Sequence, residues 1–153
     1  MSLSLLKKTT TMEIFSWDDS LSVKIKIIDD QHKVLLGMIN NYYNEIHKIL
    51  EGNSKQNLKE LRIDLISKMK KYSIEHFKTE EELFEKYHYP AFEEHKKEHD
   101  AFIDKVLHLE KRLEEKKIIL TTDITDFLKD WVITHIMDED QKYGEFLRSN
   151  GVS

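Results

Sequence analysis

Two pairs of side chains that can bind metal ions lie near the middle of the chain, each spaced by four residues. His76 and Glu80 form the first pair, and His95 and His99 form the second. A helix turns about 100° per residue, so residues four apart lie on one face, one turn from each other. Imidazole nitrogen and carboxylate oxygen together suit iron, zinc or manganese. Each pair can direct two donor atoms at one point, although an isolated pair at this spacing is more often an ordinary helix surface.

Three further candidate donors lie outside these pairs: His32, His135 and Asp140. His32 by itself is typical of a partly buried histidine. His135 and Asp140 are five residues apart, and on an ideal α-helix such side chains point about 140° away from each other. Binding of one ion by both residues therefore requires a local π-type bulge, an unwound turn or a long reach of the side chains.

Apolar residues recur at helical spacing in four segments, and the loops between them are short. The expected helices cover residues 29–50, about 55–87, 90–117 and 121–147. The residues expected to begin them are, in order, Asp29 or Asp30, Ser54, Pro90, and Thr121 or Thr122. Four helices joined by short loops predict an all-α, up-down-up-down antiparallel bundle.

In such a bundle the starts of the odd helices and the ends of the even helices lie at the same level. All seven candidate donors fall at that level: His32, His76, Glu80, His95, His99, His135 and Asp140. Burying five imidazoles without a metal ion would carry a large desolvation cost. The sequence therefore predicts a metal site at one end of the core. His47, His88 and His108 lie off this level and are expected to be surface or packing residues.

The N-terminal part of the chain has a different character. Residues 1–10 are expected to be a loose extension or a leftover of cloning, preceding a single bundle domain at residues 11–153. Val23, Ile25 and Ile27 alternate with lysines, which is a strand-like pattern. Because no second strand is predicted to pair with it, we expect an extended arm across the bundle, anchored by Trp17. A short edge strand is the alternative.

Composition excludes several classes of function. The chain has no cysteine, which excludes disulfides, thiolate nucleophiles and iron–sulfur clusters. Its net charge of −5, with acidic and basic residues interspersed, gives no basic stripe for a nucleic acid. No apolar run approaches the roughly 20 residues that span a bilayer. We therefore expect a cytoplasmic protein with no nucleic-acid or membrane partner, either a monomer or a weak homo-oligomer, with no protein partner identified.

The order of these donors resembles that of the hemerythrin family, specifically the single-domain bacterial type. The matching motifs are WDDSLSV, IIDDQHK, HFKTEE, YHYPAFEEHKKEH and WVITHIMDED, within about residues 17–147. Myohemerythrin is itself an example of the up-down bundle. The resemblance implies two non-haem iron ions joined by an oxo or hydroxo bridge, with His95, His99 and His135 on one and His32 and His76 on the other. Glu80 and Asp140 would bridge them. Lys24 departs from the family, which often has glycine there, and this puts the path of the arm in doubt.

Two octahedral ions need about twelve coordination positions, and these ligands with one bridging oxygen leave a single vacancy beside His32 and His76. One vacancy suits a small diatomic molecule, and the family binds dioxygen. We expect an oxygen-binding protein for carriage, storage or delivery, with no catalytic residues. An apolar pocket for dioxygen would consist of Leu35, Phe77, Trp131, Val132 and Ile136. The alternatives are an oxygen or redox sensor acting through a separate partner, and a di-iron oxidase, peroxidase or nitric-oxide scavenger.

Overall fold

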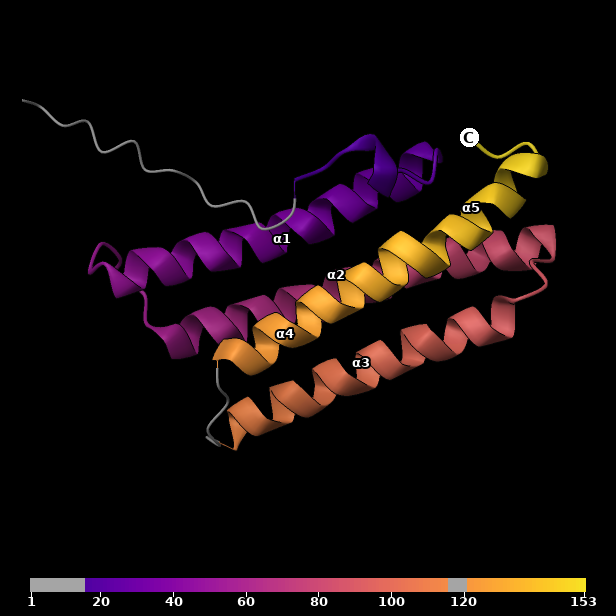
Figure 1. Cartoon of the computed structure of the whole chain (residues 1–153). Coiled ribbons are helices and arrows are strands. Elements are labelled where there is room, and N and C mark those ends of the chain that lie inside the picture. Colours follow the sequence, from indigo (N-terminus) through magenta and orange to yellow (C-terminus); the bar gives the residue numbers. More distant parts are fainter. Residues whose placement is uncertain (1–15, 116–120) are drawn as a thin grey trace, which may run out of the picture.

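The computed structural model describes residues 16–115 and 121–153, without the side chains at positions 121–123, 125, 132 and 133. Four long helical rods run antiparallel through this part of the chain (Figure 1). A short 3₁₀ turn, η1, precedes them. The elements are η1 (Asp19–Leu21), α1 (Lys26–Leu50), α2 (Leu58–Tyr87), α3 (Phe92–Glu114), α4 (Thr121–Trp131), η2 (Val132–Glu139) and α5 (Asp140–Ser149). The expected all-α antiparallel bundle is confirmed, and residues 1–10 lie outside the described part.

The last rod consists of three elements in one line. Figure 1 shows α4 and α5 as successive parts of one long helix, and the π-helical segment η2 joins them. A π-helix is an i→i+5 variant of the α-helix that is rare and concentrated at functional sites. None of the described helices is both long and apolar enough to cross a membrane.

Most helices begin at other residues than the sequence predicted. The prediction of Asp29 or Asp30 as N-cap is wrong, because α1 begins at Lys26 without a side-chain cap. Asp29 instead lies in the first turn of α1, where its carboxylate accepts bonds from the backbone N–H of Val23 and the Ser22 hydroxyl, at 2.9 and 2.6 Å. An acid in a first turn is favoured by the helix dipole, and here it also holds the preceding chain.

The other helix starts show similar differences. Asn57, not Ser54, caps α2, and its side chain accepts a bond from the Glu60 N–H. Pro90 precedes α3, which begins at Phe92. The predicted cap at Thr121 or Thr122 falls on side chains outside the described set. Polar residues occur at several places in each loop, so sequence alone left the choice of cap open.

The entry arm packs on the bundle without forming a strand in the described residues. Val23 and Ile25 are fully buried, whereas Ile27 already belongs to α1 and is exposed. Trp17 packs against the core, and the Lys33 ammonium lies 4.9 Å from the centre of its ring. Lys24 has a φ of 58°, in the left-handed region that favours glycine.

A polar layer separates two apolar clusters of the core. The larger cluster includes Leu35 on α1 and Phe102 on α3, and the smaller includes Ile28 on α1 and Phe84 on α2. On α1, His32 lies between Ile28 of the smaller cluster and Leu35 of the larger one, and the donors of the other rods likewise lie between residues of the two clusters. The polar layer contains all seven candidate donors, and each is at most 2% exposed.

Candidate metal centre

The widened turn of η2 brings His135 and Asp140 to one side of the last rod. The backbone N–H of Asp140 donates to the carbonyl of His135, five residues back, which is the π-helical bond. His135 Nε2 consequently lies 3.0 Å from Asp140 Oδ1. Of the three alternatives that the five-residue spacing left open, the structure shows the π-type distortion.

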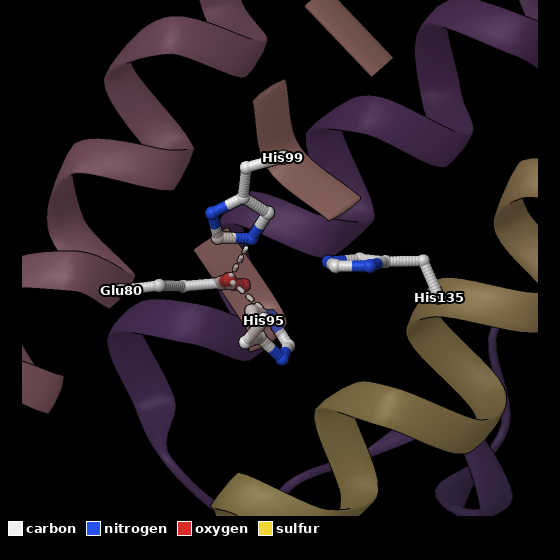
Figure 2. A group of neighbouring side chains, drawn as sticks. All are labelled: Glu80, His95, His99 and His135. Carbon is white, nitrogen blue, oxygen red and sulfur yellow. Dashed lines mark ion pairs between the residues drawn. The ribbon is translucent and has the colours of Figure 1, made fainter. Parts of the chain in front are cut away.

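The seven predicted donors converge in two overlapping groups. Within each group, one donor atom from each residue lies within 4.8 Å of every other. The first group is Glu80, His95, His99 and His135, and the second is His32, His76, Glu80 and Asp140. Figure 2 shows the first group, in which histidines from α3 and η2 surround a carboxylate from α2. Four different rods therefore contribute donors to one buried centre.

Glu80 turns one oxygen toward each group. Its Oε1 lies 2.6 Å from His76 Nε2 and 3.6 Å from His32 Nε2. Its Oε2 lies 2.9 Å from His99 Nε2 and 3.3 Å from His95 Nε2 (Figure 2). The carboxylate is thus shared between the two groups of histidines.

Asp140 is shared in the same way. Its Oδ2 lies 2.9 Å from His32 Nε2. Its Oδ1 lies 3.3 Å from His95 Nε2 and 3.0 Å from His135 Nε2. Two carboxylates that each span two groups of imidazoles are the arrangement expected of bridging ligands between two ions.

Charge interactions within this layer are strong because it is buried. Burial opposes protonation of His32, but the adjoining Asp140 and Glu80 carboxylates outweigh it and raise the pKa of His32 to about 9. The same balance raises the pKa of His95 to about 9 and that of His135 to about 10. Burial by itself would raise the pKa of both carboxyl groups, but neighbouring histidines, chiefly His76 beside Glu80 and His135 beside Asp140, hold it below its usual range. In the absence of metal, protons would therefore compensate the two acids.

The donor atoms themselves indicate that a metal ion fits. The Nε2 atoms of all five histidines, Glu80 Oε2 and both Asp140 oxygens are buried without a hydrogen-bond partner. They lie at contact distance from one another, yet their geometry is not that of hydrogen bonds. Buried polar atoms in native proteins are nearly always paired, so a set of converging donors without hydrogen-bond partners fits a metal ion. The mixture of imidazole and carboxylate fits iron, zinc or manganese.

Comparison with known proteins identifies the family. The model of the hemerythrin HHE cation binding domain matches residues 23–147. The chain belongs to the hemerythrin family. The match begins at Val23 of the buried arm and ends at Leu147 of α5, so it includes all seven donors of the centre.

Individual hemerythrins are similar over nearly the whole chain. Bacteriohemerythrin of Methylococcus capsulatus is 31% identical over 137 residues, which cover 89% of this chain and 98% of the relative. A hemerythrin-like protein of Naegleria gruberi is 34% identical, over 88% of this chain and 95% of the relative. A crystal structure of wild-type hemerythrin superposes with a TM-score of 0.75 at 26% identity, and the match covers 88% of this chain and 98% of that one.

Four residues that contact the candidate donors were not identified from the sequence. Tyr143 donates its hydroxyl to Glu80 Oε1 at 2.9 Å. Nδ1 atoms of three histidines face side-chain oxygens: His76 faces Gln31, His99 faces Glu81, and His135 faces Glu98. Gln31, Glu81 and Glu98 are each next to a donor in the chain but contact a donor on another rod. Spacing along one helix gives no signal for such pairs.

The residues predicted to form an apolar pocket lie near the centre. Leu35, Phe77 and Ile136 are buried in the larger apolar cluster. The Phe77 ring stacks on His99 with ring centres 3.9 Å apart, and Trp131 stacks on His135 at 4.5 Å. The side chain of Val132 lies outside the described set. His47, His88 and His108 are exposed.

Proposed function

We propose that this protein binds dioxygen reversibly at a non-haem di-iron centre and serves in oxygen carriage, storage or delivery. The observation that supports it most directly is that Glu80 and Asp140 each present one oxygen to each group of histidines. In this proposal His95, His99 and His135 bind one iron, and His32 and His76 bind the other. Membership of a family of cation-binding domains supports the same assignment.

The number of donors favours binding over turnover. If five imidazoles, two carboxylates shared between the ions and one solvent oxygen held two octahedral ions, one of about twelve positions would remain free, beside His32 and His76. Two ferrous ions held by these residues would supply the electrons for reversible binding of a diatomic molecule. A single vacancy leaves no place for an organic co-substrate. The set also has few anionic donors to stabilise high-valent iron.

The side chains of the protein hold and shield this centre. Hydrogen bonds at the Nδ1 atoms of His76, His99 and His135 place the proton on that nitrogen and leave the Nε2 lone pair free for a metal ion. Leu35 and Ile136, at most 1% exposed, belong to the apolar cluster that borders the centre and excludes water from it. Exclusion of water and acids favours release of intact dioxygen.

Iron content tests the ligand assignment. The purified protein should bind about two iron ions per chain, and His99→Ala should lower that number because it removes one of the ligands. His108→Ala removes an exposed histidine from the same helix and should leave the iron content unchanged. Full iron content in the His99 variant would contradict the assignment.

An optical titration tests the reaction. Reduced protein exposed to oxygen should develop a visible charge-transfer band that disappears when oxygen is removed. Continuous consumption of oxygen in the presence of a reductant, without a reversible band, would instead indicate an oxidase or peroxidase. Reversible binding whose affinity changes when another protein is added would favour the sensor.

A further inference from the structure

The hydrogen-bond partners behind the histidines differ between the two groups. His135 Nδ1 lies 3.0 Å from a carboxylate oxygen of Glu98, and His99 Nδ1 lies 3.3 Å from one of Glu81. His76 Nδ1, in the other group, lies 2.7 Å from the side-chain oxygen of Gln31, which is an uncharged amide. Two histidines of the three-histidine group thus have carboxylate partners. In the group of His32 and His76, the partner of His76 is a neutral amide.

The amide of Gln31 is held in a fixed orientation. Its nitrogen donates to the Thr79 hydroxyl at 3.0 Å, and that hydroxyl donates to the Glu75 carbonyl at 3.1 Å. Because the nitrogen is engaged there, the oxygen of Gln31 faces His76 and accepts a hydrogen bond from its Nδ1–H group. The neutral partner is therefore built into the contact between α1 and α2.

A carboxylate behind an imidazole attracts its Nδ1 proton and makes the Nε2 atom a stronger electron donor to a metal ion. A stronger donor stabilises the more highly charged state of that ion. We propose that Glu98 and Glu81 are positioning residues that make the two metal positions electronically unequal, favouring ferric iron beside His95, His99 and His135. This inference rests on the proposed di-iron function.

The difference in donor strength between the two metal positions predicts the order in which the centre takes up electrons. The first electron added to the diferric protein reduces the iron beside His32 and His76, whose ligands are weaker donors and fewer. The second reduces the iron beside the three histidines, at a lower potential. The anionic partners therefore widen the separation between the two one-electron steps.

Spectroelectrochemistry of the iron-loaded protein tests this order. Glu98→Gln keeps an acceptor for His135 but removes its charge, so the second step should move to a higher potential. The expected change in the ferric-to-ferrous ratio is about tenfold, or about 59 mV for one electron. Gln31→Glu places a charge behind His76 and should lower the potential of the first step. Either substitution should narrow the separation of the steps, and Glu98→Asp should largely preserve it.

Asp104→Asn is the matched control, because it removes one negative charge from an exposed position on α3. This substitution should shift the reduction potentials of both steps by the same amount, and by less than Glu98→Gln shifts the second step. Equal shifts of both steps in the Glu98 and Gln31 variants, or a narrowing in the Asp104 variant, would overturn the inference. A parent protein that binds no pair of irons would instead refute the proposed function, so the two failures are distinguishable.

Discussion

At the scale of single residues, Tyr143 shows how a buried side chain fixes a donor that it does not replace. Its hydroxyl donates to Glu80 Oε1, and neither side chain is exposed. Burial, together with the nearby Asp140 and Glu80 carboxylates, raises the pKa of Tyr143 well above its usual value. The phenol therefore remains protonated and continues to orient the shared carboxylate.

Replacing Tyr143 by phenylalanine should weaken metal binding while the fold is kept. Residues that hydrogen-bond to metal ligands typically contribute about 10- to 100-fold in metal affinity, and a loss in that range is expected here. Competition with a chelator measures it. Tyr89→Phe is the control, because Tyr89 packs in the same aromatic cluster, with its ring centre 6.5 Å from that of Tyr143. Equal affinities in the two variants would show that the hydroxyl of Tyr143 has no role in metal binding.

At the scale of elements, the entry arm and α5 approach each other closely at Gly144. A β-carbon built there would lie 3.0 Å from Val23 Cβ and 3.2 Å from the Val23 carbonyl oxygen. Arg148 donates to the same carbonyl, which ties the arm to the helix that begins at Asp140. The arm thus lies against one side of the polar layer through a close contact that favours glycine.

Gly144→Ala should destabilise the protein although alanine favours helices. Overpacking a tight contact costs about 1–3 kcal/mol, whereas alanine in place of glycine in a helix contributes about 1 kcal/mol of stability. Denaturant unfolding measures the net loss. Gly37→Ala on α1 is the matched control: a β-carbon added there would meet no neighbouring side chain of the described residues within 4 Å, so the substitution should stabilise the protein. If Gly144→Ala stabilised the protein as Gly37→Ala should, the arm would have moved to accommodate the added methyl group at little cost in free energy.

At the scale of the whole molecule, the charges of the buried layer couple folding to pH. Without metal, His32, His95 and His135 have pKa values raised to about 9, about 9 and about 10. A raised histidine pKa contributes stability that is fully present below about pH 6.5 and is lost as pH rises through the folded pKa. The lowered carboxyl pKa values contribute stability that is lost only in acid. Burial lowers the pKa of His76, so this residue reduces the stability of the folded protein as pH falls below about 6.5.

The metal-free protein should therefore lose thermal stability between about pH 7 and pH 10. In the metal-loaded protein the imidazoles are already neutral, so its melting temperature should change less over that range. Metal ions and protons compete for the same nitrogens, and the difference in melting temperature between the two forms should widen as pH rises. Parallel melting curves of both forms across this range would contradict the buried charge arrangement.

Sequence was sufficient for the fold and for the convergence of the donors, because helical periodicity and short loops predict an up-down bundle, and that topology brings the seven donors to one level. The five-residue spacing of His135 and Asp140 even indicated a π-type turn among its alternatives. The ends of helices were less predictable, as Asp29 shows, since a carboxylate can serve either as a cap or within the first turn. The partners of the histidines, such as Glu98, were inaccessible because they depend on how neighbouring rods are rotated against each other.

In the proposed two-ion centre, the sharing of Glu80 and Asp140 has a consequence for how the ions are taken up. A single ion in either position would leave one oxygen of Glu80 and one oxygen of Asp140 without a metal ion to bind. A second ion would then find both of its carboxylate ligands already held in place. Filling should therefore be positively cooperative. A cell short of iron would then contain a mixture of complete and empty molecules, with few half-filled ones.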